Sequence, residues 1–298
     1  MTRAGLQAAT WRSPEGAQAT RAGSAGVVAV IARKEVKDAL RNRWFVLYSA
    51  GFALMATALA YLSLGDMGTA RLAGFGRTAA GLVNLVLLVV PLMGLTLGAQ
   101  SLAGELERGT LATLLSQPIT RTQALLGKFL GLGLALCAAV LLGFGLAACL
   151  VAIRAGAVDA GAFAMIVGAA VLLALAMLAL GFLISSAARY AGAATAVALS
   201  VWLVLVFVGD LGLMGTALTL RLPVGTLLAL TVVNPLEAFR IGTVAAMTGA
   251  LDALGPAGVY ATRTFGTGLG AALAGVLVAW CVVSLVGAGL ILRRRAIC

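Results

Sequence analysis

The chain has few residues that could carry out chemistry, and several of them lie in one stretch, GELERGTLATLLSQPITRTQALLGKFLG, at residues 104–131. The pair Gly127-Lys128 in this stretch has the form of the end of a nucleotide-binding P-loop. A P-loop has Ser or Thr directly after the lysine and a further glycine five positions before the second glycine. Here Phe129 follows the lysine, and Thr122 takes the place of the upstream glycine. We therefore expect no catalytic residues in this chain and no hydrolysis of ATP by this chain alone.

Metal ligands are equally sparse. Copper(I) prefers cysteine, methionine and histidine side chains, and the sequence has no histidine. The eight methionines are scattered without an MxxM or MxxxM pair, and packing explains most of them. The cysteines form no CxxC pair and are best explained as small buried hydrophobic residues; they are Cys137, Cys149, Cys281 and Cys298. We expect the chain to hold neither a metal nor another cofactor.

The composition of the chain places it in a lipid bilayer. Its 298 residues are 62% hydrophobic and 10% charged, whereas soluble domains average about 45–50% apolar and about 25% charged residues. Helices and closed β-barrels are the structures that satisfy every backbone group in lipid. The apolar runs here are long and continuous instead of alternating, which favours helices over a barrel. We predict an all-α, polytopic membrane protein.

A membrane-spanning helix needs about 20 predominantly apolar residues. Six stretches meet this requirement, at residues 44–64, 80–102, 125–153, 163–185, 191–213 and 269–292. Between the last two, the apolar segment LPVGTLLALTVV follows Arg221, ends at Asn234-Pro235 and is too short to span. We interpret residues 214–268 as a periplasmic region with an interfacial or re-entrant helix, and a seventh span is the alternative.

Basic residues set the expected orientation of the spans. With the N-terminus in the cytoplasm, alternate crossing places fifteen of the 21 Lys and Arg residues on the inside. The other six fall outside, at Arg71, Arg77, Arg154, Arg221, Arg240 and Arg263. The positive-inside rule then favours both termini in the cytoplasm. The net charge of +11 therefore indicates orientation signals and contacts with anionic lipid, not nucleic-acid binding.

The N-terminal segment divides into two parts. Residues 1–26 are rich in Ala, Gly, Thr and Arg and have no apolar stretch, so we predict a disordered cytoplasmic tail. In residues 27–43, apolar and charged side chains recur with a helical period on opposite faces. This pattern predicts an amphipathic helix along the bilayer surface, with a plain cytosolic helix as the alternative. The basic residues of this interfacial helix are Arg33, Lys34, Lys37 and Arg41.

Polar and small residues inside the predicted spans are the remaining signals. Asn84, Thr96 and Gln100 in the second span are expected to bond across helices. The acidic residue of the fifth span lies near its outer end, so no buried acidic relay for a proton-driven transporter is evident. Gly127 and Gly131 form a GxxxG pair, a spacing that lets helices approach closely. In a chain with 38 glycines, chance alone explains such a pair.

On this topology the charged stretch falls in the cytoplasm, between the second and third spans. Residues 105–115 favour a helix, Pro118 stops it, and Thr120 and Thr122 are suited to cap the next helix. The result is a short helix outside the membrane whose acidic and apolar faces suit docking to another protein; a solvated loop is the alternative. The residues expected to make this contact are Glu105, Glu107, Arg108, Gly109, Thr110, Leu111, Leu114, Leu115 and Pro118.

The same stretch resembles the signature of ABC-2-type transporter permeases. In that family an acidic-Gly-Thr run, an LLSQP segment and an R…GK pair follow the second span. The resemblance implies that residues 27–298 form one permease domain with six spans, an amphipathic N-terminal helix and a coupling region at 104–122. It also implies a separate cytoplasmic ATPase, which binds ATP and magnesium and drives the coupling region, and a homodimer of permeases in a bacterial inner membrane.

Three further segments narrow the resemblance. IARKEVKDALRNRW, GLVNLVLLVVPLMGL and NPLEAFRIG, at residues 31–44, 81–95 and 234–242, are similar to permeases that serve copper-centre maturation of nitrous oxide reductase in denitrifying bacteria. This resemblance implies a periplasmic copper-handling repeat protein as a partner. The permease then passes mechanical work to that partner or moves another compound, such as a sulfur species. An ABC-2 exporter of another substrate, and a membrane scaffold or secondary carrier without an ATPase, are the alternatives.

Overall fold

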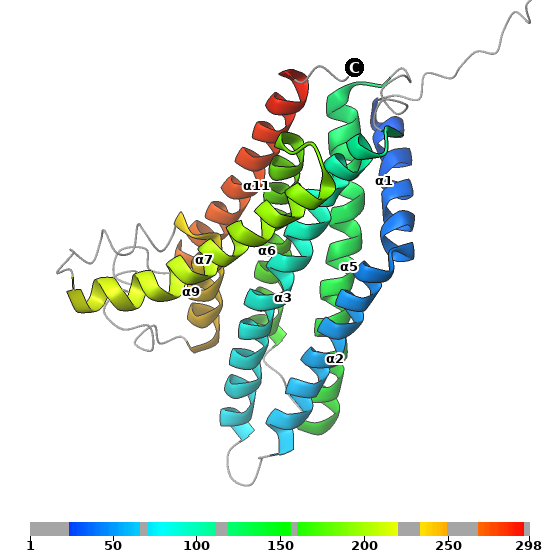
Figure 1. Cartoon of the computed structure of the whole chain (residues 1–298). Helices are drawn as coiled ribbons and strands as arrows, with labels where there is room; N and C mark the ends of the chain where they lie inside the picture. Colours follow the sequence, from blue (N-terminus) through cyan, green and yellow to red (C-terminus); the bar gives the residue numbers. More distant parts are fainter. Residues whose placement is uncertain are drawn as a thin grey trace, which may run out of the picture.

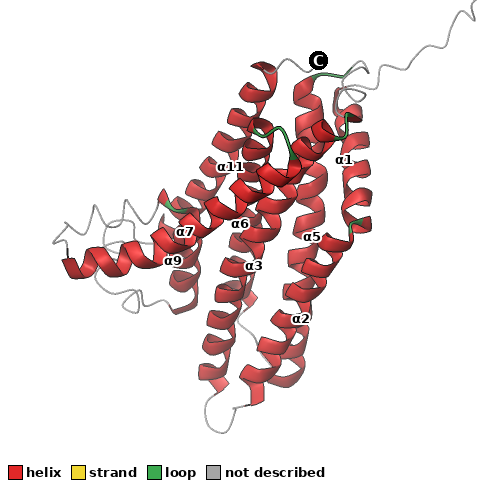
Figure 2. Cartoon of the chain, viewed as in Figure 1, coloured by secondary structure: helices red, strands yellow, loops and turns green. Residues whose placement is uncertain are grey.

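The computed structural model describes residues 24–65, 71–110, 119–155, 160–219, 233–248 and 268–294. This part of the chain consists of helices and their connections and contains no strand (Figure 1, Figure 2). In chain order the helices are α1 (Ser24–Arg41), α2 (Arg43–Gly65), α3 (Arg71–Glu107), α5 (Arg121–Ala155), α6 (Ala160–Ala187), α7 (Ala191–Thr219), α9 (Pro235–Thr248) and α11 (Leu269–Arg294). The predicted all-helical architecture is confirmed for these residues.

Five of the described helices are long and apolar enough to cross a membrane. The segments that qualify are Arg43–Leu62, Ala80–Glu107, Arg121–Ile153, Phe163–Ala187 and Leu269–Arg294. They coincide with five of the six predicted spans. The remaining one lies in α7, where Ala191–Phe207 forms a shorter apolar segment, so the count of six stays a prediction. The tail before α1 and most of the predicted periplasmic region lie outside the described residues, and within that region the structure adds α9.

The contact between α3 and α6 forms the centre of the bundle (Figure 1). Glycines bring the two backbones together here. A Cβ added at Gly98 would lie 2.4 Å from the carbonyl oxygen of Leu178, and one added at Gly181 would lie 2.6 Å from that of Leu95. Small residues allow this close approach in membranes, where van der Waals packing between helices replaces the hydrophobic driving force. The large ring of Phe182 is fully buried in the surrounding core.

A single hydroxyl group fixes α6 against α3. Ser185 Oγ donates a hydrogen bond to the carbonyl oxygen of Ala99 (2.6 Å) and accepts one from the N–H of Leu102 (3.0 Å) and one from the N–H of Ala103 (2.8 Å). All three partners are backbone groups of α3, and Ser185 is fully buried. The bonds therefore set the register of α6 along α3 as well as the distance between them.

α1 runs beside the first turns of α5 (Figure 1). A Cβ added at Gly127 would lie 2.7 Å from Cβ of Ile31, and one added at Gly131 would lie 2.5 Å from the carbonyl oxygen of Ala32. The GxxxG pair, which chance explains equally well in the sequence, is the surface on which α1 packs. The basic residues of α1 are exposed, namely Arg33, Lys34, Lys37 and Arg41. The position of this helix along the bilayer surface stays a prediction.

Candidate functional site

The coupling region begins as a direct continuation of the second span. α3 runs unbroken through Glu105 to Glu107, so the prediction that a separate helix starts at Glu105 is wrong. Charged residues follow apolar ones at this point, and nothing in that change interrupts helical hydrogen bonds. The helix is terminated by Gly109, whose φ of +72° is the left-handed conformation that glycine adopts after helix ends. The N–H of Gly109 donates to the carbonyl oxygen of Leu106 (3.2 Å).

The far end of the coupling region is fixed by a reciprocal cap at the start of α5. The N–H of Thr120 donates to Oε1 of Gln123 (2.9 Å), and the N–H of Gln123 donates to Oγ1 of Thr120 (3.2 Å). This arrangement is a capping box, which makes Thr120 the N-cap that the sequence predicts. Thr122 places its hydroxyl 3.0 Å from that of Thr120 and supports the cap instead of forming one. Arg121 Nη1 donates to the carbonyl oxygen of Leu292 (2.6 Å) and so joins α5 to the end of α11.

A buried group of charges joins the two ends of the coupling region. Lys128 on α5 is 1% exposed. Its Nζ lies 2.7 Å from Oε1 of Glu105 on α3 and 2.7 Å from Oε1 of Glu35 on α1. Lys34, whose side chain is 56% exposed, places its Nζ 3.8 Å from both of these oxygens. We call these four residues the Lys128 cluster; two lysines balance two glutamates, so the cluster is neutral.

Because the Lys128 cluster is buried, disrupting it is expected to cost much of the free energy of folding. Both contacts of the Lys128 ammonium have the length of charge-assisted hydrogen bonds. Removing one partner of a buried ion pair typically costs about 3–5 kcal/mol, because the remaining charge is left without compensation. Oε2 of Glu105 is buried and has no hydrogen-bond partner in the described part of the chain. Lys128 is therefore the principal partner of the Glu105 carboxylate.

The last turn of α3 also reaches α7. Oε2 of Glu107 accepts a hydrogen bond from the N–H of Ala191 (2.9 Å), the first residue of α7. A carboxylate at this position satisfies a free amide and interacts favourably with the helix dipole. Arg108 folds back, and its Nε donates to the carbonyl oxygen of Gly104 (3.0 Å). Glu105 and Glu107 thus contact different helices although they are two residues apart.

The structure separates the expected contact residues into three groups. Glu105 is mostly buried in the Lys128 cluster. Four residues at the end of α3 are exposed, namely Glu107, Arg108, Gly109 and Thr110. The last four lie outside the described residues, namely Leu111, Leu114, Leu115 and Pro118.

The sequence analysis missed Glu35 and Lys128, which complete the cluster. Glu35 lies one helical turn after Ile31 and one turn before Ala39, so it belongs to the apolar side of α1. Lys128 is a single charge in the apolar start of the third span. Opposite charges that both stand among apolar residues are costly unless they pair. That rule is the signal that could have brought these two residues together.

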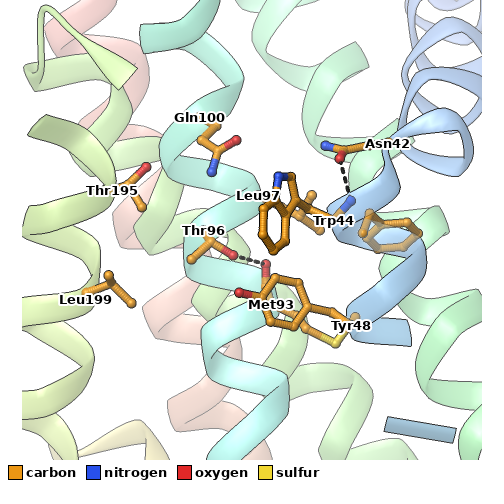
Figure 3. A pocket seen from close by; sticks show the side chains of 10 residues that line it. Asn42, Trp44, Tyr48, Met93, Thr96, Leu97, Gln100, Thr195 and Leu199 are labelled. Atoms are coloured by element: carbon orange, nitrogen blue, oxygen red, sulfur yellow. Dashed lines mark hydrogen bonds between the residues drawn. The ribbon is translucent and has the colours of Figure 1, made fainter. Parts of the chain in front are cut away.

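A pocket of about 260 Å³ lies between α2, α3 and α7 (Figure 3). Trp44 and Tyr48 line it from α2, and Thr96 and Gln100 line it from α3. The Thr96 hydroxyl donates to the carbonyl oxygen of Leu92 in its own helix (2.6 Å), and Gln100 is exposed. The expectation that Thr96 and Gln100 bond across helices is therefore wrong for the described part of the chain. The pocket separates these side chains from the neighbouring helices.

The polar side chains of the site form ion pairs and hydrogen bonds that connect helices. Within the described ranges, no three His, Cys, Asp or Glu side chains come together as metal ligands. What the site does contain is a charged segment whose two ends are held by caps, by backbone bonds and by the Lys128 cluster. Such a segment, set between two long apolar helices, belongs to a multi-pass membrane protein.

Comparison with known proteins gives this class its family. Residues 29–296 match the family described as ABC-2 family transporter protein, and the chain belongs to this family. It is 35% identical over 271 residues to the probable ABC transporter permease protein NosY of Stutzerimonas stutzeri, covering 89% of this chain and 97% of the relative. It is 35% identical over 221 residues to the protein of the same name from Pseudomonas aeruginosa, covering 72% of this chain and 80% of the relative. The chain is thus a permease similar to the NosY proteins.

Proposed function

We propose that this chain is driven by a separate cytoplasmic ATPase that docks on the coupling region, residues 104–122. The observation that carries the proposal is the way in which the region is attached. α3 enters it without a break through Glu107, and α5 leaves it from the capping box at Thr120. A force applied between these two points enters two long helices through rigid joints. Membership of the ABC-2 family supports the same function.

The likeness to NosY permeases supports a finer proposal. The transporter works in a bacterial inner membrane as a homodimer of permeases, with both termini of this chain in the cytoplasm. A NosF-like ATPase subunit binds ATP and magnesium, while the permease itself binds no cofactor. A NosD-like periplasmic repeat protein that handles copper is the second partner. The complex serves copper-centre assembly of nitrous oxide reductase by transport or by mechanical delivery to that partner.

Charge reversal at the exposed end of α3 tests the docking proposal. In Glu107→Lys, we expect less ATPase to copurify with the permease, because like charges facing basic ATPase residues would cost several kcal/mol. Glu107→Gln removes the negative charge but keeps the cap of α7, since an amide oxygen still accepts the hydrogen bond from Ala191. This variant therefore measures the contribution of the charge to docking. Reversal of Glu105 is unsuitable because it would disrupt the Lys128 cluster.

The control is Arg33→Glu, a charge reversal at an exposed residue of α1 outside the Lys128 cluster. This control is expected to keep wild-type ATPase retention. If Glu107→Lys also keeps it, the charges of α3 solvate a loop and do not form the docking contact. If wild-type permease retains no ATPase at all, the alternative class of a scaffold or secondary carrier applies.

Two further measurements test the finer proposal. Reporter fusions at Met1 and Cys298 should both give cytoplasmic signals, and a periplasmic signal from either would overturn the topology. The purified permease should hold no stoichiometric copper(I) in the presence of a competing chelator, and retention of the metal would contradict the proposal on cofactors. Mass spectrometry of small molecules that copurify with the whole transporter would then separate transport from mechanical delivery.

A further inference from the structure

The Lys128 cluster is a poor choice if its purpose is stability alone. Replacing a buried ion pair by apolar residues of similar volume is often neutral or stabilising. The packing of α1 on α5 is already supplied by Gly127, Gly131 and the buried side chain of Ile31. A fully buried lysine between two carboxylates adds a directional link to that packing. This link joins Glu35 of α1 and Glu105 of α3 to Lys128 of α5.

The contact between Glu105 and Lys128 closes the coupling region into a loop. The two residues are 23 positions apart in the chain, and the segment between them contains nearly all of the coupling region. Glu105 stands two residues before the end of α3, and Lys128 stands about two turns after the start of α5. The 2.7 Å bond between their side chains therefore lies at the base of the loop. A displacement of the loop must carry this bond with it.

Glu35 connects a third helix to the base of the same loop. Its carboxylate accepts from the same ammonium group as Glu105, and it lies 93 residues from Lys128 in the sequence. Glu35 belongs to α1, which leads into the first span at Asn42. Oδ1 of Asn42 accepts from the N–H of Trp44 (3.0 Å) and so begins α2. The link therefore runs from the coupling region through Lys128 to the helix that precedes the first span.

We propose that Lys128 is a positioning residue that makes α1 follow the coupling region when the partner ATPase binds nucleotide. The inference rests on the proposed function, since it requires an ATPase that moves the coupling region. Without the lysine, the ATPase still docks on the exposed end of α3, because Glu107 and Arg108 are not part of the Lys128 cluster. The displacement of the coupling region then reaches α1 only through its packing on α5 and is smaller there.

The distance between α1 and α11 gives a direct measurement. Spin labels are placed at Lys37→Cys on α1 and Arg294→Cys on α11, both exposed positions, in full-length permease whose native cysteines are replaced. Labelled permease is diluted with unlabelled permease, assembled with its ATPase in lipid nanodiscs, and measured with and without a non-hydrolysable ATP analogue. We expect the analogue to shift the distance in the otherwise unmodified protein. In Lys128→Met we expect this shift to be clearly smaller while ATPase retention and hydrolysis persist.

A second variant covers the case in which Lys128→Met fails to fold with two unpaired buried carboxylates. The triple variant Glu35→Gln, Lys128→Met, Glu105→Gln removes all three buried charges and keeps similar volumes, so it leaves no buried ion to compensate. We expect it to fold, to retain ATPase and to show the same reduced distance shift. The matched control is Arg43→Met, which removes an exposed basic residue at the start of α2 outside the cluster and should keep the shift.

The outcomes separate this inference from the function on which it rests. A shift of wild-type size in the triple variant would overturn the role of Lys128, and so would an absent shift in the unmodified complex when ATPase is bound and active. Neither result affects the docking proposal. Failure of the unmodified permease to bind any ATPase would instead overturn the proposed function and the inference with it.

Discussion

Two helix contacts in this protein use the same device to bring helices together but differ in the polar link they add. Where α3 meets α6, glycines such as Gly181 allow the backbones to touch, and the link is the neutral hydroxyl of Ser185. Where α1 meets α5, Gly127 and Gly131 do the same, and the link is the charged Lys128 cluster. Glycine sets how closely the helices approach in both places. The polar groups at the two contacts differ in charge, and so in the free energy lost when one partner is removed.

The difference assigns distinct roles to the two contacts. Hydrogen bonds between helices in membranes average about 0.6 kcal/mol and reach about 1.7 kcal/mol. A buried ion pair that loses a partner costs about 3–5 kcal/mol. The first figure is the contribution of a bond and the second is the penalty for leaving a charge unpaired, so removing one partner is expected to cost more at the charged contact. If Lys128 moves α1 with the coupling region as proposed, α3 and α6 form the static centre and the α1–α5 contact is the link that carries load.

The largest effect is expected from crowding the static centre. In Gly98→Leu the new side chain meets backbone atoms of α6, at 2.4 Å from the Leu178 carbonyl oxygen and 2.8 Å from Cα of Gly181, and backbone cannot turn away. We expect a loss beyond the upper end of the about 1–3 kcal/mol that is typical of overpacking, seen as little monodisperse protein in detergent. Gly168→Leu on α6, where nothing lies within 4 Å, is the control. Equal yields of the two variants would contradict the close contact.

A smaller loss is expected from crowding the α1–α5 contact. In Gly131→Leu the side chain meets the Ala32 carbonyl oxygen at 2.5 Å and Cβ of Glu35 at 2.6 Å. Because α1 lies at the edge of the bundle, a small shift that keeps the Glu35–Lys128 pair relieves part of the clash, and we expect a cost within about 1–3 kcal/mol. The variant should fold with a lowered melting temperature, and limited proteolysis should cleave α1 faster. Gly145→Leu on the same helix, with open space around it, should show neither change.

The neutral link is tested by Ser185→Ala. The substitution leaves the N–H groups of Leu102 and Ala103 without this acceptor inside the protein. We expect a loss of about 0.6–1.7 kcal/mol, the range measured for interhelical hydrogen bonds in membranes, read as a lower melting temperature. Ser186→Ala is a matched control, because Ser186 is also buried but bonds to the carbonyl oxygen of Leu183 in its own helix. A loss in the control as large as in Ser185→Ala would show that the hydroxyl does not hold α6 to α3.

The spans were predictable from the sequence because apolar length is a strong signal that needs no tertiary information. The predicted spans 163–185 and 269–292 end within two residues of Phe163–Ala187 and Leu269–Arg294. The start of the coupling helix was misplaced because polarity changes where the lipid ends, which need not be where a helix ends. Gln123 could have been found from the T-x-x-Q spacing of a capping box, which the sequence contains at residues 120–123.

The centre of the candidate site was not predictable in the same way. Glu35 and Lys128 are 93 residues apart, and their pairing depends on the side of α5 on which α1 packs. That choice depends on Gly127 and Gly131, whose spacing carries no information about the partner helix. Glu105 was predicted as a contact residue for a partner because its charge suggested exposure. Its burial follows from the lysine that faces it, which is a property of the fold and not of the local sequence.

The smallest effect is expected from Lys34→Ala, which compares the two lysines of the Lys128 cluster. Lys34 and Lys128 carry the same charge and reach the same two carboxylates, but Lys34 is 56% exposed and 3.8 Å away, whereas Lys128 is buried at 2.7 Å. Exposed ion pairs contribute about 0–1 kcal/mol and are screened by salt. We expect Lys34→Ala to lower the melting temperature slightly at low ionic strength and not at all at 1 M salt. A loss that persists at high salt would mean that Lys34 shares the buried charge of the carboxylates, and that the load is carried by both lysines.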